Sequence, residues 1–239
     1  MRRKLLTLTV LTATLAVGTH AQDNRWPSFL DRSQRPDGVL YLPAPPDTLG
    51  TTFASDLVWH QWGRQQRADS LRAAQARDEA SLSLGPLCRW LSGVLGKQLS
   101  EAATPATAHL ISCVVTDACG ATSRAKRHYQ RKRPFLLFGD GTLIPADEPS
   151  HHTPSYPSSH AASGWALALV LAELCPDRQE ALLKWGYDYG ESRIIAGFHY
   201  RTDVEAGRLA GSAVVARLHA DAGFRQQLEK SKHELDDIH

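Results

Sequence analysis

The chain has 239 residues, with 27 lysines and arginines against 25 aspartates and glutamates and a net charge of +2 at pH 7. Its first 21 residues contain three of the basic side chains and none of the acidic ones, so the remainder has 24 basic and 25 acidic groups and a net charge of −1. That balance argues against a protein that binds nucleic acid through general charge attraction, and the length suffices to bury the core of one domain.

The N-terminal segment has the pattern of a secretory signal peptide. Three basic residues precede an apolar stretch, Leu5–Val17, and the small residues around His20 predict cleavage after Ala21. The stretch is about 13 residues long, shorter than the ~20 residues of a membrane-spanning helix, which argues against an anchor. We therefore expect residues 1–21 to be removed and the mature protein to lie in the bacterial periplasm or outside the cell, without membrane insertion.

Residues 22–50 differ in composition from the rest of the chain. They are rich in proline and polar side chains, which predicts an extended arm that packs over the domain. Residues 51–239 have helical patterns nearly throughout, few strand signals, no internal repeat and no second domain boundary. The expected fold is therefore all-α, a single-domain helical bundle.

Proline and capping residues place several helix ends. Pro105 follows an N-cap threonine, Pro134 should end the helix before it, and Thr202 with Glu205 fits a capping box. Residues 139–157, with two glycines and four prolines, predict a long loop, which in a compact domain is often functional. The expected helical segments are 47–81, 86–95, 105–132, 160–174, 177–197, 202–219 and 224–236.

The four cysteines are Cys88, Cys113, Cys119 and Cys175. An even number in an exported protein favours disulfides over buried thiols, and four cysteines allow three connectivities. Cys113 and Cys119 are close enough in sequence to close a short loop, which would leave Cys88 to pair with Cys175. The absence of a C-x-x-C pair argues against a zinc or thioredoxin-like site.

The first candidate functional segment is basic. Six cations and no acid lie within residues 124–133. On a helix, Lys126 lies two turns before Arg133, so both could reach one point, whereas Arg131 and Lys132 would face elsewhere. The alternative is a solvated helix face, and this segment alone does not decide between them.

The second segment, Pro157–His160, lies where a loop enters a helix. The unpaired N–H groups of a helix N-terminus favour an anion, and a histidine in the first turn can donate a proton to a leaving oxygen. Taken alone, the segment is better explained by an N-cap at Ser158, with no catalytic role for His160.

The third segment, Ser192–Asp203, carries the most specific pattern. Arg193 can hold a phosphate through two parallel hydrogen bonds. His199 and Asp203 are four residues apart around a helix start, so the carboxylate can fix one ring nitrogen and leave the other as a nucleophile. A structural His–Asp pair is the alternative, and its co-occurrence with the other two segments argues against it.

These segments resemble the motif of the type 2 phosphatidic acid phosphatase superfamily, K-x6-RP, PSGH and SR-x5-H-x3-D. The first and third match without gaps, and the likeness covers essentially the whole mature chain. Within the superfamily, stretches such as residues 168–173 and 211–216 look most like the bacterial class A non-specific acid phosphatases. The resemblance implies the helical bundle shared by acid phosphatases and vanadium haloperoxidases.

The resemblance also implies a role for each motif residue. His199 would attack phosphorus, Asp203 would orient His199, and His160 would protonate the leaving alkoxide and then activate water. Ser159 occupies the glycine position of the family, and a left-handed backbone there would cost serine about 1–2 kcal/mol. The implied phosphate-binding residues are Lys126, Arg133, Ser158, Ser159 and Arg193, with no metal and no cofactor.

The expected function is a secreted, metal-independent acid phosphatase that hydrolyses small-molecule phosphomonoesters through a phosphohistidine, with phosphoryl transfer to alcohols as a side reaction. One neutral and one protonated histidine imply a mildly acidic optimum. The alternatives are a vanadium-dependent haloperoxidase and a non-catalytic oxyanion-binding protein. A membrane-embedded lipid phosphatase lacks support because no apolar run after residue 21 is long enough. The preferred ester and the oligomeric state, including a homo-oligomer, stay open.

Overall fold

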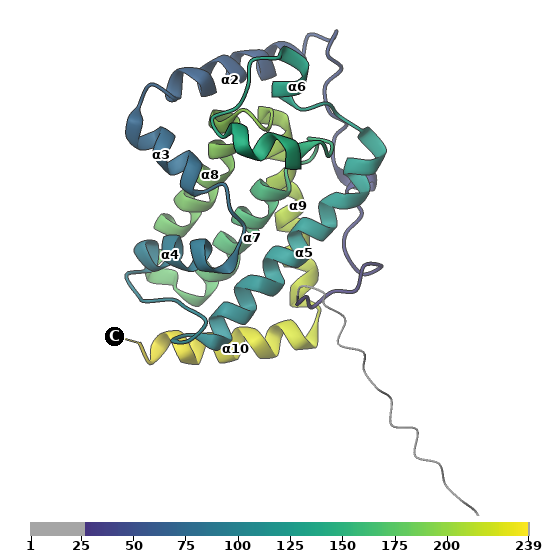
Figure 1. The fold of residues 1–239 in the computed structure, drawn as a ribbon. Helices are drawn as coiled ribbons and strands as arrows, with labels where there is room; N and C mark the ends of the chain where they lie inside the picture. Colours follow the sequence, from purple (N-terminus) through teal and green to yellow (C-terminus); the bar gives the residue numbers. More distant parts are fainter. Residues whose placement is uncertain (1–26, 239) are drawn as a thin grey trace, which may run out of the picture.

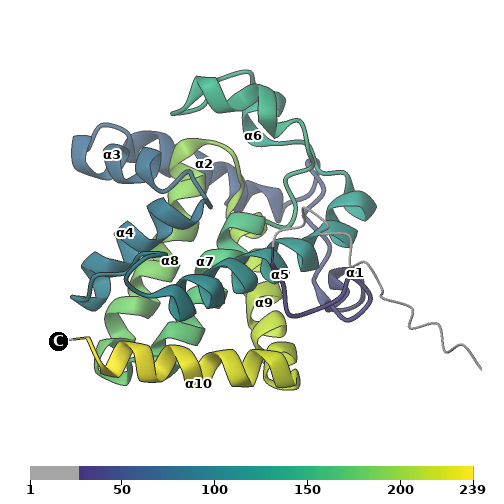
Figure 2. The ribbon, with the colours of Figure 1, turned by 60° about the horizontal axis from the view of Figure 1, so that its bottom comes forward.

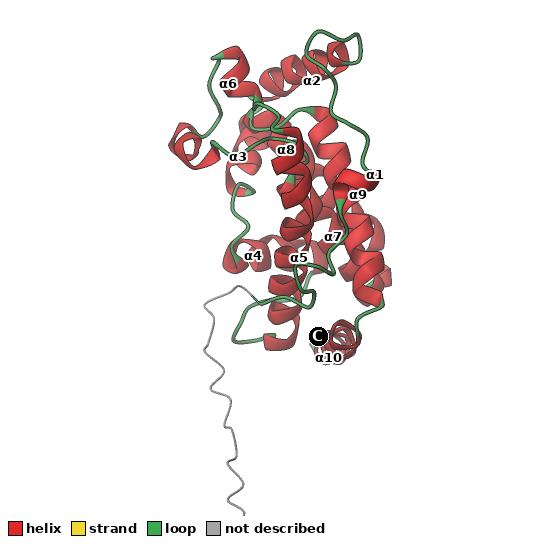
Figure 3. Cartoon of the chain, turned by 90° about the vertical axis from the view of Figure 1, so that its right-hand side faces the viewer, coloured by secondary structure: helices red, strands yellow, loops and turns green. Residues whose placement is uncertain are grey.

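The computed structural model describes residues 27–238, and this part of the chain is built of helices and loops without a strand (Figure 3). The expected all-α fold is thereby confirmed. The predicted signal peptide, residues 1–21, lies outside the described residues. Among the described helices, none combines the length and the apolar character needed to cross a bilayer.

One buried helix organises the bundle. α7 (Ser159–Leu174) lies at the centre and contacts α5 (Pro105–Tyr129), α8 (Gln179–Ala196) and α9 (Arg201–His219), as both views of the ribbon show (Figures 1 and 2). Its side chains are apolar almost all round, so they are buried on every side rather than on one face. The predicted segment 160–174 therefore corresponds to α7.

The remaining helices surround this core. α10 runs across one end of the bundle below α5, and α2 and α3 pack against α8 (Figure 2). The bounds are α1 Gly38–Tyr41, α2 Phe53–Gln66, α3 Ser70–Asp78, α4 Leu84–Leu95, α6 Pro134–Phe138, η1 Pro145–His151, η2 Pro176–Arg178 and α10 Ala222–Asp236.

Two glycines let α9 approach α7 closely. A Cβ atom at Gly207 would lie 2.5 Å from the carbonyl oxygen of Ser158, and one at Gly211 would lie 2.5 Å from that of Ala162. Ser158 N also donates to the carbonyl oxygen of Asp203 at 2.9 Å. The close approach thus brings the start of α9, which carries the third segment, beside the start of α7, which carries the second.

Several helix ends differ from those expected. The segment 47–81 is two helices, because the Asp69 carboxylate caps α3 by accepting from Leu71 N and Arg72 N. In the predicted loop 139–157, residues of η1 form a short 3₁₀ helix.

The residues that cap the start of α9 also differ from those expected. It begins at Arg201, and the side chain that reaches back to the N-cap backbone belongs to Asp203, which accepts from Tyr200 N. Glu205, the expected member of the box, pairs with Arg201 instead.

The disulfide prediction is wrong for this structure, in which all four cysteines are free thiols. Cys113 and Cys119 lie on the same helix, α5, six residues apart. That spacing separates their Cα atoms by about 9 Å along the helix axis, beyond the ~7 Å limit for a disulfide. The helix expected from residue 105 onward already included both cysteines, so the proposed short disulfide loop was incompatible with that prediction as well.

Candidate active site

The turn between α8 and α9 holds His199 against Asp203. Gly197, with φ of 86°, ends α8, and α9 begins two residues after the histidine. His199 Nδ1 donates to Asp203 Oδ2 at 3.2 Å, and the same oxygen accepts from Tyr200 N at 3.0 Å. His199 is 4% exposed and Asp203 is fully buried. Because a carboxylate only accepts, it places the proton on Nδ1 and leaves a lone pair on Nε2.

Arg133 faces that lone pair. Its Nη1 donates to His199 Nε2 at 3.0 Å and to the carbonyl oxygen of Phe198 at 3.1 Å. Its Nε donates to the carbonyl oxygen of Thr153 at 2.8 Å, which holds the guanidinium against the long loop. The arginine therefore lies in front of the nitrogen that the sequence marks as a nucleophile.

Two further cations complete the cluster. Arg193, in the last turn of α8, is 1% exposed and stacks over the Phe198 ring at 4.7 Å, and its Nε and Nη1 have no hydrogen-bond partner. Lys126, near the end of α5, donates through Nζ to the carbonyl oxygens of Pro154 and Ser155 at 2.8 and 3.2 Å. Buried guanidinium N–H groups without a protein acceptor suit an anionic ligand.

The two serines at the start of α7 use their side chains within the protein. Ser158 is the N-cap and accepts from Ala161 N at 3.2 Å. Ser159 lies in the first turn without a positive φ, and its Oγ is 2.7 Å from Oγ of Thr122 on α5. The strain expected for a left-handed serine does not arise, and the hydroxyl is bound to α5.

His160 is held by contacts with the end of α3 and with α8. Its Nε2 donates to the carbonyl oxygen of Glu79 at 2.6 Å, and its ring stacks on Tyr189 with a centroid distance of 4.7 Å and an interplanar angle of 12°. The contact with Glu79, at the end of α3, was not foreseen from the sequence, because a backbone acceptor 81 residues away leaves no local pattern. It leaves Nδ1 as the ring nitrogen free for a ligand.

The cluster carries an excess of buried positive charge. Burial, followed by the charges of Arg133 and Lys126, lowers the pKa of His199 well below its ordinary value. Burial, followed by the charge of Arg193, does the same to the pKa of His160. Burial and Arg133 together lower the pKa of Lys126 to about 7. Groups that disfavour one another's protonation in this way are stabilised by a bound anion.

No role was predicted for Arg131, which was expected to face away from the point that Lys126 and Arg133 share. The side chain is buried, and its Nη1 donates to Asp203 Oδ1 at 2.6 Å. Gln130, with φ of 49°, ends α5, so residues 131–133 are not helical and the assumed helical geometry does not apply to them. In an extended segment alternate side chains share a face, which places Arg131 with Arg133 and turns Lys132 to solvent. The proline after Arg133 was the available signal.

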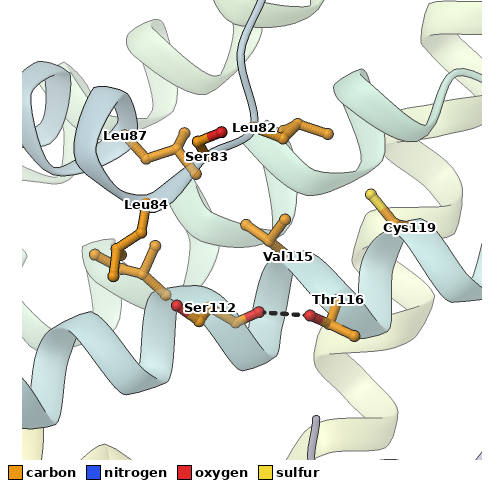
Figure 4. A pocket seen from close by; sticks show the side chains of 9 residues that line it. Leu82, Ser83, Leu84, Leu87, Ser112, Val115, Thr116 and Cys119 are labelled. Atoms are coloured by element: carbon orange, nitrogen blue, oxygen red, sulfur yellow. Dashed lines mark hydrogen bonds between the residues drawn. The ribbon is translucent and has the colours of Figure 1, made fainter. Parts of the chain in front are cut away.

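An apolar cavity lies along α5 (Figure 4). It has a volume of about 320 Å³ and is walled by residues of α4, α5 and the segment before α4. Cys119 at its edge lies 3.2 Å from Ser163, one turn after His160 on α7. None of the lining side chains is charged, so the cavity is separate from the anion-binding groups. Its lining residues are Leu82, Ser83, Leu84, Leu87, Ile111, Ser112, Val115, Thr116 and Cys119.

Comparison with known proteins agrees with this geometry. The sequence model of the PAP2 superfamily matches residues 105–226, which include all three candidate segments. The chain is 38% identical over 209 residues to a non-specific acid phosphatase of Providencia stuartii, covering 87% of this chain and 84% of that protein. It is 37% identical over 200 residues to one of Salmonella typhimurium, covering 83% and 80%. A third relative, an acid phosphatase of Zymomonas mobilis, is 36% identical over 201 residues, covering 84% and 76%.

Proposed function

This chain belongs to the PAP2 superfamily, and we propose that it is a secreted, metal-independent acid phosphatase that hydrolyses phosphomonoesters through a phosphohistidine. The resemblance drawn from the three segments is thereby confirmed at the level of family and enzyme class. The observation that supports the phosphohistidine most directly is the ring of His199, whose Nδ1 donates to Asp203 while Nε2 points at a cation. The signal pattern of residues 1–21 supports export.

Substrate binding would use the three cations. Lys126, Arg133 and Arg193 would neutralise the oxygens of the phosphoryl group, aided by the N-terminus of α7. Arg133 Nη1 lies where phosphorus must approach His199 Nε2. We infer that its N–H turns from the imidazole to a phosphate oxygen when substrate binds, which frees the lone pair only when there is something to attack.

In the first chemical step, His199 Nε2 forms a bond to phosphorus and the ester P–O bond breaks. His160 gives a proton to the leaving oxygen, and Nδ1 is the nitrogen available for this because Nε2 is held by Glu79. The bound phosphate dianion offsets the cations that lower the pKa of His160, so the histidine can be protonated at mildly acidic pH.

In the second step, His160 takes a proton from water, and the water oxygen attacks phosphorus and releases His199. Asp203 keeps the Nδ1 proton in place through both steps, so the ring returns to its starting tautomer. An alcohol in place of water would accept the phosphoryl group by the same route, which accounts for the transferase side reaction.

The pH profile of dinitrophenyl phosphate hydrolysis, measured with EDTA present, tests both the activity and the role of Lys126. The leaving group of this ester needs no proton, so its kcat/KM does not depend on the protonation of His160, whose pKa burial lowers well below the ordinary value. Lys126 binds phosphate oxygens only while charged, and its pKa is about 7. We therefore expect kcat/KM to be highest in mildly acidic solution and to fall about tenfold per pH unit on the alkaline side. Lys126→Arg should move this alkaline limb upward, since a guanidinium stays charged.

A rate that rises steadily to pH 9 would contradict the assignment of Lys126. Loss of activity in EDTA would contradict the metal-independent mechanism. Absence of hydrolysis in the presence of tight phosphate binding would favour the non-catalytic oxyanion-binding protein.

Ser159→Gly is expected to have little effect on the reaction, although this restores the glycine of the family motif. The serine hydroxyl is bound to Thr122 and its backbone is helical, so glycine removes one hydrogen bond without opening the phosphate site. We expect kcat/KM to change by less than about threefold and stability to fall by about 1 kcal/mol. Thr122→Val, which removes the same hydrogen bond from the other side, is the matched control. A rise of tenfold or more in Ser159→Gly alone would show that the hydroxyl obstructs catalysis.

A further inference from the structure

A buried network of charged side chains connects to the catalytic histidine through Asp203. Asp203 Oδ1 accepts from Arg131 Nη1 at 2.6 Å, while Oδ2 accepts from His199 Nδ1. Arg131 Nη2 in turn donates to Asp56 Oδ2 at 2.7 Å. Asp56 comes from α2 and is 75 residues from Arg131 in sequence. The order of groups is therefore Asp56, Arg131, Asp203 and His199.

The arrangement fixes the Asp203 carboxylate in its plane. One oxygen is held by the arginine, and the other is shared by the histidine and the backbone of Tyr200. The guanidinium is itself held on three sides, by Asp56, by Oγ1 of Thr202 at 2.8 Å and by the Tyr200 ring at 4.0 Å. Neither carboxylate is exposed. Rotation of Asp203 away from the imidazole would break a charged hydrogen bond in a buried site.

Asp56 also connects this network of side chains to the start of α9. Its Oδ1 accepts from Thr202 N at 3.0 Å and its Oδ2 from Thr202 Oγ1 at 2.7 Å. The first turn of α9 carries both Thr202 and Asp203. The same aspartate therefore orients the arginine and the helix turn that presents the catalytic carboxylate.

We propose that Arg131 is a positioning residue for the proposed phosphoryl transfer, acting through Asp203 to orient His199, and that Asp56 holds Arg131 in place. The inference rests on the proposed function of His199. Arg131 touches neither the lone pair of His199 Nε2 nor the three phosphate-binding cations in any contact of the structure, so its effect falls on the chemical step rather than on phosphate binding.

At low pH the rate falls as His199 takes a proton on Nε2 and ceases to be a nucleophile, and this fall is the acid limb of the pH profile. The charges of Arg131 and Asp56 predict that their removal shifts this limb in opposite directions. Arg131→Gln removes a positive charge and makes protonation of His199 easier, so the limb moves to higher pH. Asp56→Asn removes a negative charge and makes it harder, so the limb moves to lower pH, by less because Asp56 is farther away. The other titratable groups around His199 and Asp203 are unchanged in both variants; they are Lys126, Arg133, His151, Tyr156, Arg193 and Tyr200.

The experiment measures kcat and kcat/KM for p-nitrophenyl phosphate from pH 4 to 9, with the inhibition constant of inorganic phosphate. In Arg131→Gln we expect kcat to fall by up to about 100-fold, the loss that misplacement of a reacting group gives, while the phosphate inhibition constant stays within about threefold. Arg131→Lys keeps the positive charge but loses the planar guanidinium that donates to both aspartates. Its acid limb should therefore stay at the wild-type position, and part of kcat should return.

Arg35→Gln is the matched control. Arg35 forms a partly buried ion pair, with Asp117 at 3.0 Å, where the N-terminal arm meets α5. Arg35→Gln should lower the unfolding temperature without moving the acid limb.

The proposal is overturned if Arg131→Gln behaves in the same way as Arg35→Gln, or if Arg131→Gln and Asp56→Asn both shift the acid limb in the same direction. It is also overturned if kcat and phosphate binding fall together in Arg131→Gln. Should Arg131→Gln fail to fold, Asp56→Asn decides alone: a downward shift supports the proposal, and no shift or an upward one overturns it. Failure of the proposed function itself would appear separately, as a wild-type protein without hydrolysis.

Discussion

His199→Ala is expected to reduce the hydrolysis of every phosphomonoester by on the order of 10⁴-fold or more, the scale on which loss of a nucleophile acts. The variant lacks the only ring nitrogen held between Asp203 and a phosphate-binding cation in the described structure. Phosphate binding should persist, because Lys126, Arg133 and Arg193 remain. Rapid quench with ³²P-labelled substrate should trap acid-labile phosphoprotein in the wild type and none in the variant.

His60→Ala is a suitable control for this prediction. His60 also forms a His–Asp pair, partly buried, with Asp140 at 2.7 Å, but its ring faces Phe138 at 4.7 Å rather than the three cations. It should retain hydrolysis and phosphoprotein. Trapped phosphoprotein in His199→Ala would assign the nucleophile to another residue.

His160→Ala should separate the two chemical steps. With an alkyl phosphate, whose leaving oxygen needs a proton, we expect a loss of about 10²–10⁴-fold. With dinitrophenyl phosphate the leaving group needs no proton, so His199 should still be phosphorylated quickly. Without a base to activate water, the phosphoenzyme would then persist. Stopped-flow absorbance should show a burst of dinitrophenolate equal to the enzyme concentration, followed by slow turnover.

Two comparisons make the result specific to His160. His199→Ala should give no burst with either ester, because the covalent step itself is lost. His219→Ala, which removes a half-exposed histidine paired with Glu173, should behave like the wild type. Equal losses for the alkyl and dinitrophenyl esters in His160→Ala, without a burst, would show that the histidine does not act as the acid.

Expectations based on local spacing agreed best with the structure. The start of the central helix was predicted to within one residue. An apolar segment of this length, bounded by residues that favour turns, is expected to form a helix buried on all sides. The contact between His199 and Asp203 followed from residues four apart around a helix start. The basic segment was only half understood, because the left-handed Gln130 that ends α5 gives no periodic signal. The contact of Arg131 with Asp203 was consequently not predicted.

The sequence by itself determined the family, the all-α class and the identity of the groups at the candidate site, because these depend on residue type and on spacing along single segments. Only the tertiary structure decided what surrounds those groups. It joined Asp56 to Arg131 and Thr202, placed the carbonyl oxygen of Glu79 on His160, turned the Ser159 hydroxyl to α5 and left the cysteines as thiols. The physical reason is that these contacts join segments tens of residues apart in sequence, which only the packing of the helices brings together.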